Sequence, residues 1–248
     1  MLKKVAFIPA RSGSKRIIDK NIRRLNGHPL IAYSIQSALD SGIFDSVICA
    51  TDSERYADIA SYYGAEIPLL RPLDISGEKS SDIEWVTWIL DYLKSKQREY
   101  DVFSILRPTS PFRKGETIQR AWKQFSEAVG VDSLRAIELC KQHPGKMWIV
   151  NGSRMTPLLP MSTLNQPFHS TQYAALPQVY VQNASLEMAW TKVVTDHHTI
   201  AGNVIMPFLT SEEEGLDVNE EFDWWRAERL LEGNNAALPL IKKQPWNK

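Results

Sequence analysis

The sequence has only two cysteines and no apolar run long enough to cross a bilayer. So few cysteines exclude a disulfide framework, and Cys49 lies in an apolar strand pattern where we expect a buried, unreactive thiol. Lys3 and Lys4 precede only a short apolar run, so we expect no leader segment. These shortages favour a reducing, cytoplasmic setting and no membrane partner.

Net charge is lacking as well, because the 248 residues hold 29 basic and 29 acidic side chains. A chain without net charge has no global attraction to nucleic acid or to a membrane surface, so neither is expected as a partner. The length fits one large domain, or one domain with an appendage, and a 43% hydrophobic composition is ample for a core. We therefore predict a single domain over residues 1–248.

The first apolar stretch, Val5–Ile8, leads into a loop of small residues that carries several cations. Its short length and the following Pro9 favour a buried parallel strand. In the loop, Ser12, Gly13 and Ser14 form a turn whose backbone N–H groups can bind an anion. Four cations surround this turn: Arg11, Lys15, Arg16 and Lys20.

The loop fits neither of two phosphate-binding glycine patterns, G-x-x-x-x-G-K-[ST] and G-x-G-x-x-G. By itself, a solvated basic turn is therefore at least as good an interpretation of this stretch. Its position favours function, because ligands of open α/β sheets bind outside the carboxyl ends of the strands. Arginine can fork onto phosphate oxygens while lysine acts as a point charge, so we predict that the loop binds nucleotide phosphates.

Strand and helix patterns alternate from this loop to about residue 129. The predicted strands cover 46–50 and 102–106, and the predicted helices cover 30–39, 54–63, 81–96 and 116–129. Pro29 and Gly42 bound the first helix, and Ser81-Asp82-Ile83-Glu84 is a capping box. Thr51-Asp52-Ser53 is well explained as the cap of the second helix. The alternation predicts an α/β fold with a doubly wound, mostly parallel sheet.

The pattern changes after residue 132. We predict strands at 133–139, 186–190 and 204–206, and a hairpin in which 147–150 leads into the turn Asn151-Gly152. The stretch 155–178 holds four prolines and little periodicity, which is unusual inside a compact domain. A second subunit is the simplest partner for it, and a disordered insert is the alternative. Its apolar residues favour burial: Leu158, Leu159, Phe168 and Tyr173.

The segment 212–233 is predicted to end in a helix. Asn219 can cap it, its first turn is acidic, and Phe222, Trp225 and Arg229 follow at helical spacing. We expect one ring of Trp224-Trp225 to point inward and the other to lie at the surface. Asp217 lies just ahead of the helix, where a carboxylate could hold Mg²⁺. On spacing alone a second capping acid is the better interpretation.

Several of these stretches together resemble the acylneuraminate cytidylyltransferases, or CMP-sugar synthetases. The order of the matching motifs is the family's and they span nearly the whole chain. The matching stretches are 8–16, 20–22, 50–53, 64–66, 70–72, 107–113, Pro177, Tyr180, Asn183-Ala184 and Asp217 with Glu221, Ala227 and Glu228. The first motif together with the Pro-Thr-Ser-Pro loop after Arg107 is the strong part of the match.

The resemblance implies a Rossmann-like nucleotidyltransferase fold and a cytidylyltransferase activity. In this family the anomeric hydroxyl of a 2-keto-3-deoxy sugar acid attacks the α-phosphorus of CTP, and pyrophosphate leaves. A dimerisation extension within 133–180 and a homodimer are implied too, as is Mg²⁺. For the acceptor the resemblance implies a nonulosonic acid of the sialic or legionaminic type.

The resemblance also assigns site residues. The implied catalytic residues are Arg11, Lys20 and Asp217, of which Asp217 is also the implied metal ligand. The implied nucleotide-binding residues are Ala10, Arg11, Ser12, Gly13, Ser14, Lys15, Asn21, Ser81, Arg107, Pro108, Thr109 and Ser110. The implied sugar-binding residues are Arg113, Lys146, Gln172, Tyr180 and Asn183.

The chain departs from the sialic-acid pattern in ways that bear on metal and sugar. The first of two aspartates before the last helix is Gly215 here, so the metal would rest more on phosphate, water or an acid such as Glu214 or Glu187. The Pro-Thr-Ser-Pro motif is preceded by Arg107 where glutamine is usual, and Asn-Gly-Ala becomes 183–185, Asn-Ala-Ser. The stretch 143–148 and the Gly-Leu-Asp of 215–217 look more like the legionaminic branch. Two alternatives stay open: a CMP-ketodeoxyoctulosonate synthetase, and a degenerate relative that binds nucleotide without turnover.

Overall fold

The computed structural model describes residues 1–247. Its strands are β1 (Lys4–Pro9), β2 (Arg24–Leu25), β3 (His28–Pro29), β4 (Ser46–Ala50), β5 (Val102–Ile105), β6 (Ser133–Leu139), β7 (Trp148–Asn151), β8 (Arg154–Pro157), β9 (Tyr180–Trp190) and β10 (Ile205–Leu209). Its α-helices are α1 (Leu30–Ser41), α2 (Glu54–Tyr63), α3 (Asp82–Ser95), α4 (Gly115–Glu127), α5 (Lys192–His197) and α6 (Glu221–Glu232). Its 3₁₀ helices are η1 (Lys20–Ile22), η2 (Leu73–Ile75), η3 (Pro144–Lys146), η4 (Phe168–Ser170), η5 (Tyr173–Ala175) and η6 (Glu212–Gly215).

The chain forms two compact units. The main unit comprises Met1–Ala136 and Asn183–Lys248, and the second comprises Ile137–Gln182. The second unit overlaps the range in which the resemblance implies a dimerisation extension. That role, and the assignment of the chain to one domain, stay predictions.

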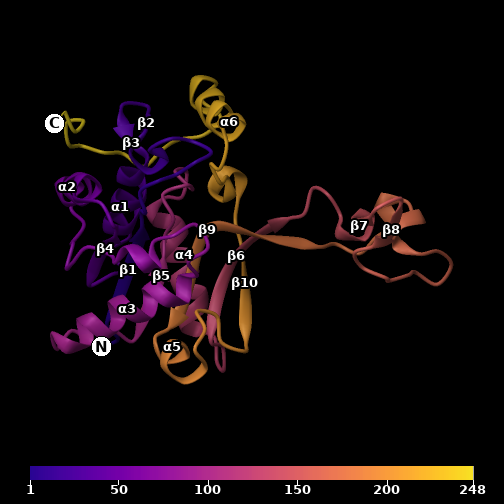
Figure 1. Ribbon diagram of the computed structural model, residues 1–248, viewed down its shortest axis with the longest axis horizontal. Coiled ribbons are helices and arrows are strands. Elements are labelled where there is room, and N and C mark those ends of the chain that lie inside the picture. The colour runs from indigo at the N-terminus through magenta and orange to yellow at the C-terminus, as the bar shows by residue number, and fades with distance from the viewer. Residues whose placement is uncertain (248) are drawn as a thin grey trace. The chain divides into compact units, whose positions relative to one another are not determined.

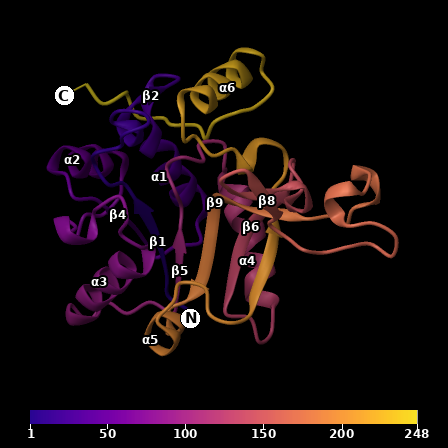
Figure 2. The ribbon, with the colours of Figure 1, turned by 45° about the vertical axis from the view of Figure 1, so that its right-hand side comes forward.

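The main unit is built on a six-stranded sheet in the order β10-β6-β9-β5-β1-β4 (Figures 1 and 2). β1 pairs in parallel with both β4 and β5, and β9 runs antiparallel to β5. Successive residues of β1 enter opposite cores: Ala6 and Ile8 pack with α1, α2 and α4, whereas Val5 and Phe7 pack with α3 and α5. This alternation is the period of a strand covered on both faces. The prediction of a doubly wound, mostly parallel α/β sheet is confirmed.

The predicted helices of the first half are confirmed because their ends are specified locally. Pro29 precedes α1, and Gly42 ends it in the left-handed conformation with φ 63°. The Ser53 side chain accepts from the backbone N–H of Tyr56 at the start of α2. Ser81 and Glu84 form the capping box of α3. Figure 1 shows α6 and the β2–β3 hairpin at the end of the sheet that lies away from the N-terminus.

The structure corrects two sequence predictions near the C-terminal half. β9 is much longer than the predicted 186–190 strand. Its first residues are exposed and lack an apolar pattern, and they belong to the strand because β9 pairs with its neighbours in the sheet. Asn219 does not cap α6; Glu220 is the capping residue, and Asp223 accepts its backbone N–H. The expected split of the tryptophan pair is confirmed, because Trp224 is buried and Trp225 is exposed.

The second unit contains the predicted hairpin, in which β7 pairs antiparallel with β8. Phe168 is buried there and packs edge-on against His143. Leu158 and Tyr173 are exposed in the single chain, so their expected burial against a second subunit stays a prediction. In the part of the chain that the structure describes, no helix is long and apolar enough to span a membrane.

Candidate active site

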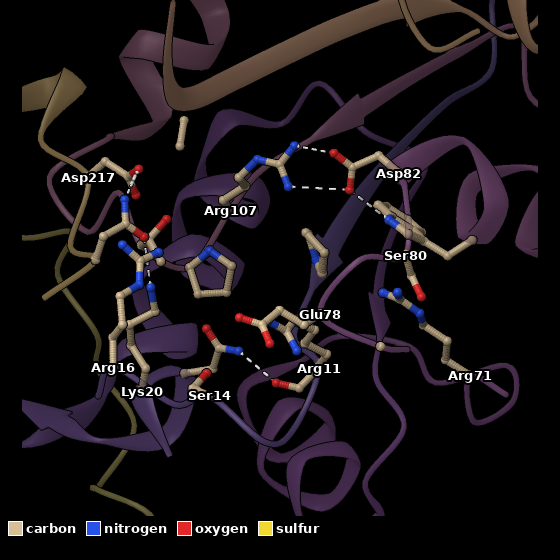
Figure 3. A pocket seen from close by; sticks show the side chains of 18 residues that line it. Arg11, Ser14, Arg16, Lys20, Arg71, Glu78, Ser80, Asp82, Arg107 and Asp217 are labelled. Carbon is tan, nitrogen blue, oxygen red and sulfur yellow. Dashed lines mark hydrogen bonds and ion pairs between the residues drawn. The ribbon is translucent and has the colours of Figure 1, made fainter. Parts of the chain in front are cut away.

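A pocket of about 380 Å³ opens in the main unit where β1 and β5 end (Figure 3). Pro9 closes β1, and the loop of Arg107, Pro108 and Thr109 follows β5, so both strands deliver their carboxyl ends to the pocket. The lining residues are Pro9, Arg11, Ser14, Arg16, Lys20, Asn21, Arg71, Gly77, Glu78, Ser80, Asp82, Trp85, Arg107, Pro108, Thr109, Ala184, Asp217 and Asn219. The pocket thus lies at the predicted location, outside the carboxyl ends of parallel strands.

The loop after β1 is fixed by a carboxylate from the loop after β4. Asp52 accepts from the Ser12 backbone N–H at 2.7 Å and from the Ser12 hydroxyl at 2.6 Å. Gly13 supplies the left-handed turn with φ 71°, and the buried Asn21 side chain donates to the Arg11 carbonyl at 3.2 Å. Helix capping, the sequence interpretation of the 51–53 stretch, applies to Ser53, whereas Asp52 holds the loop in shape.

For the CTP that the resemblance implies as ligand, Asp52→Ala is expected to weaken binding about tenfold. Hydrogen bonds to a charged group stabilise by roughly 1.5–3 kcal/mol, and about 1.4 kcal/mol is a factor of ten. Calorimetric titration with CTP measures the change. Asp58→Ala removes an exposed carboxylate from α2 and serves as the control. Equal affinity in the two variants would mean that the loop keeps its shape without Asp52.

The cations of the pocket are not equally engaged. The Arg11 guanidinium forms no hydrogen bond or ion pair with the described residues, 1–247, and lines the cavity. Lys15 does not line it; it pairs at 2.7 Å with Glu78, and both side chains are exposed. Arg71 lies over the Trp85 ring and donates through Nε to the Ile75 carbonyl at 2.8 Å. Arg16 also lines the cavity and its guanidinium has no such partner in residues 1–247, so Arg11 and Arg16 are the cations most available to a ligand.

Lys20 and Asp217 come together on one side of the pocket, with Arg16 beside them in Figure 3. Lys20 Nζ donates to the Val218 carbonyl at 2.8 Å and to Asn219 Oδ1 at 3.0 Å. The Asn219 amide donates in turn to Asp217 Oδ2. Burial lowers the pKa of the Lys20 ammonium, and the negative charge of Asp217 opposes that shift.

On the other side of the pocket Arg107 is held by two carboxylates. Its Nη2 donates to Asp82 Oδ2 at 2.6 Å and to Glu187 Oε1 at 2.7 Å, and Glu187 also pairs with Arg135. Trp85 Nε1 donates to Asp82 Oδ1 at 2.8 Å. Burial raises the pKa of Asp82, but the Arg107 hydrogen bond and charge outweigh it, so the pKa lies below its usual range.

Comparisons with known proteins bear on this geometry. A family model described as cytidylyltransferase matches residues 5–185. The CMP-N,N'-diacetyllegionaminic acid synthase of Legionella pneumophila is 34% identical over 242 residues, which cover 94% of this chain and 98% of that protein. The chain belongs to the cytidylyltransferase family. It is a nucleotidyltransferase, and its relatives place it among the CMP-nonulosonic acid synthetases.

Two further likenesses agree with the family. The N-acylneuraminate cytidylyltransferase of Escherichia coli is 31% identical over 235 residues, which cover 93% of this chain but only 52% of that protein. A solved structure of CMP:2-keto-3-deoxy-manno-octonic acid synthetase complexed with CTP has a TM-score of 0.66 at 13% identity. The match covers 94% of this chain and 99% of the chain in that structure. At that identity the likeness concerns the fold, which is the predicted nucleotidyltransferase fold.

The pocket brings together about half of the site residues implied by the sequence. Those that line it are Arg11, Ser14, Lys20, Asn21, Arg107, Pro108, Thr109 and Asp217. Ala10 is buried, its N–H bound to the Ala50 carbonyl, and Ser110 is buried behind the surface of its loop. Ser12, Gly13 and Lys15 lie in the loop without lining the cavity, and Ser81 serves the capping box of α3.

The implied sugar-binding residues are not gathered in this pocket. Arg113 is completely buried and donates to the Ser185 carbonyl and the Ser34 hydroxyl, and burial lowers the pKa of its guanidinium. Asn183 donates to the Thr210 hydroxyl at 2.9 Å, and its neighbour Ala184 lines the pocket instead. The other three belong to the second unit: Lys146, Gln172 and Tyr180. There Lys146 Nζ donates to the carbonyls of His169 and Thr171.

Several lining residues were missed from the sequence. Asp82 was interpreted as part of the capping box, and Trp85 was not singled out; both hold the Arg107 side of the pocket. Arg71 lies in the Leu-Arg-Pro match at 70–72, which was a usable signal. Glu78 and Ser80 lie in a polar stretch that gave no signal, and Asn219 was interpreted as a helix cap.

The donor set fits Mg²⁺ in part. Asp217 Oδ1 is buried and has no hydrogen-bond partner in the described residues, so one carboxylate oxygen is available. Glu214 binds Thr117 and Arg120, and Glu187 binds two arginines, so neither joins Asp217. No group of three or more acids, histidines or cysteines within residues 1–247 is arranged to hold a metal ion. A single carboxylate suits Mg²⁺, which takes its remaining ligands from water and substrate phosphate.

Proposed function

We propose that the protein transfers CMP from CTP to the anomeric hydroxyl of a legionaminic-type nonulosonic acid and releases pyrophosphate. The observation that carries the proposal is the cationic pocket at the ends of β1 and β5, in a chain 34% identical to a CMP-N,N'-diacetyllegionaminic acid synthase over nearly its full length. A sialic acid is the second candidate for the acceptor, supported by the 31% identity to an N-acylneuraminate cytidylyltransferase.

In the proposed reaction the hydroxyl oxygen forms a bond to the α-phosphorus while the bond from that phosphorus to the bridging oxygen breaks. Pyrophosphate leaves with the electron pair, and the hydroxyl proton passes to solvent. The protein has little covalent chemistry to perform, so its task is in-line positioning and stabilisation of charge. Arg11 is proposed to offset charge on the leaving group, and Lys20 to hold the triphosphate with Arg16 beside it.

We propose Mg²⁺ as the cofactor, with Asp217 as its protein ligand. Bound there, the ion would shield phosphate charge and polarise the α-phosphate. Asn21, which fixes the Arg11 carbonyl, would help to orient the nucleotide. We assign the other side of the pocket, with Arg71, Asp82 and Arg107, to base and sugar groups, because its acids and cations largely offset each other.

We propose that the protein is a cytoplasmic homodimer, with the second unit as the interface. Its exposed apolar side chains support this, since a monomer rarely exposes so many together. They are Met147, Trp148, Ile149, Val150, Met155, Leu158, Met161 and Leu164. A dimer is expected in sedimentation velocity, and a monomer once Ile149 and Val150 are both changed to Glu. A wild-type monomer would contradict the interface.

The substrate is tested by incubating the protein with CTP, Mg²⁺ and a panel of nine-carbon and eight-carbon sugar acids. The largest kcat/KM is expected with a legionaminic-type acid. Preference for an eight-carbon acid would support a CMP-ketodeoxyoctulosonate synthetase. CTP binding without turnover of any acid would support a degenerate relative.

A further inference from the structure

Asn219 lies in the pocket between two groups of opposite charge. The Lys20 ammonium donates to its Oδ1 at 3.0 Å, and its Nδ2 donates to Asp217 Oδ2. These partners fix the orientation of the amide, because an ammonium only donates and an ionised carboxylate only accepts. The oxygen must face Lys20 and the NH₂ group must face Asp217. The amide therefore bridges the cation and the carboxylate.

The side chain of Asn219 is not used to cap α6. Asp223 Oδ2 accepts the backbone N–H of Asn219 at 2.9 Å and that of Glu220 at 3.0 Å, so Asp223 satisfies the first turn. Val218 N–H donates to the Thr109 carbonyl at 2.8 Å, which ties this segment to the loop after β5. The backbone around Asn219 is held without its amide, and the amide is left for the site.

The two partners also dictate the residue type at position 219. An aspartate could accept from Lys20, but it could not donate to Asp217, and its charge would cancel that of the ammonium. A neutral amide keeps the positive charge of Lys20 available. Val218 and Asn219 together accept two of the three ammonium N–H groups, so one N–H remains for a substrate oxygen.

The same amide selects the free oxygen of Asp217. Oδ2 accepts from Asn219, while Oδ1 is buried and has no hydrogen-bond partner within residues 1–247. Rotation of the carboxylate would break the bond to Asn219. Oδ1 is therefore held in one place, with a lone pair that only a ligand can use.

We propose that Asn219 is a positioning residue for CMP transfer: its amide sets Lys20 and Asp217 at a fixed spacing, which leaves one N–H and one carboxylate oxygen for the phosphates and cation of Mg²⁺-CTP. This role rests on the proposed function. In this role Asn219 contacts neither the sugar hydroxyl nor the α-phosphorus. It acts through Lys20 and Asp217, which are proposed to contact the substrate.

Asn219→Ala is expected to lower kcat on the order of 10–100-fold, the usual cost of removing a partner that orients a metal-binding group. It should also weaken the Mg²⁺-dependent part of CTP binding in calorimetry. Asn235→Ala, which removes an exposed amide beyond α6, is the matched control and should leave both unchanged. The unfolding temperatures of the two variants should agree, because Asp223 retains the cap. Wild-type kcat and Mg²⁺ dependence in Asn219→Ala would overturn the proposal.

A double-mutant cycle separates positioning from a merely structural role. If Asn219 acts through Asp217, the fold-loss from Asn219→Ala should be much smaller in an Asp217→Asn background. If the fold-losses of the two single variants multiply in the double variant, the two residues act independently and the proposal is overturned. Asn219→Asp should weaken CTP binding even without Mg²⁺, because its charge cancels that of Lys20, and should alter the Mg²⁺ dependence. Wild-type affinity and Mg²⁺ dependence in this variant would also count against the proposal. Calorimetry needs no turnover, so a protein that binds Mg²⁺-CTP but transfers nothing would refute the proposed function while Asn219 is still tested.

Discussion

Arg11→Ala is expected to lower kcat by about 10²–10³-fold, the cost of removing one preorganised donor from a developing charge. The guanidinium lines the pocket and forms no hydrogen bond or ion pair with residues 1–247, so no structural partner loses a contact when it is removed. Pyrophosphate release at saturating CTP and sugar acid measures kcat. The unfolding temperature should stay that of the wild type.

The control for this variant is Arg229→Ala, which removes an exposed guanidinium on α6 that pairs with Glu232 and lies over the Trp225 ring, away from the pocket. It should keep wild-type kcat and KM. A wild-type rate in Arg11→Ala would remove Arg11 from the mechanism. A loss confined to the KM for CTP would mean that Arg11 binds ground state and transition state equally.

Asp217→Asn is expected to raise the Mg²⁺ concentration for half-maximal activity by about 10–100-fold. The substitution keeps the shape of the side chain but removes the charge that the cation needs, and Oδ1 is the carboxylate oxygen left free in the pocket. High Mg²⁺ should restore part of the activity, because water and phosphate supply the other ligands. A titration of activity against Mg²⁺ at fixed CTP measures the shift.

Asp91→Asn removes an exposed carboxylate on α3 and is the matched control. Its Mg²⁺ titration should overlay that of the wild type. An Asp217→Asn titration that also overlaid the wild type would exclude Asp217 as the metal ligand. The pocket would then rest on its cations for charge neutralisation.

Most of the fold was predictable because its signals are local. The short apolar run of β1, Gly42 after α1 and the Ser81 capping box each specify an element from a few neighbouring residues. The length of β9 was not predictable, because its first half is exposed and gains its strand conformation from pairing. The cap of α6 was assigned one residue early, since Asn219 and Glu220 are both plausible until Asp223 is seen to bind the backbone.

The sequence was enough to predict which two loops form the site. It was not enough to predict which of their side chains point into the pocket. The motif around Arg11 and the loop after Arg107 both reach the pocket. Arg113 belongs to the same loop, yet it turns inward to the Ser34 hydroxyl, which is a contact across 79 positions. The bond from Asp52 to Ser12 spans 40 positions and competes with an obvious capping role. Such directions depend on tertiary partners that sequence spacing does not reveal.

The central claim is that this pocket joins CMP to a sugar acid. Phosphorus NMR of the protein with CTP, Mg²⁺ and a legionaminic-type acid tests it most directly. We predict that the triphosphate signals give way to a phosphodiester and pyrophosphate in equal amounts, and that both products depend on the acid. Retention of intact CTP, or its hydrolysis without the phosphodiester, would contradict the account.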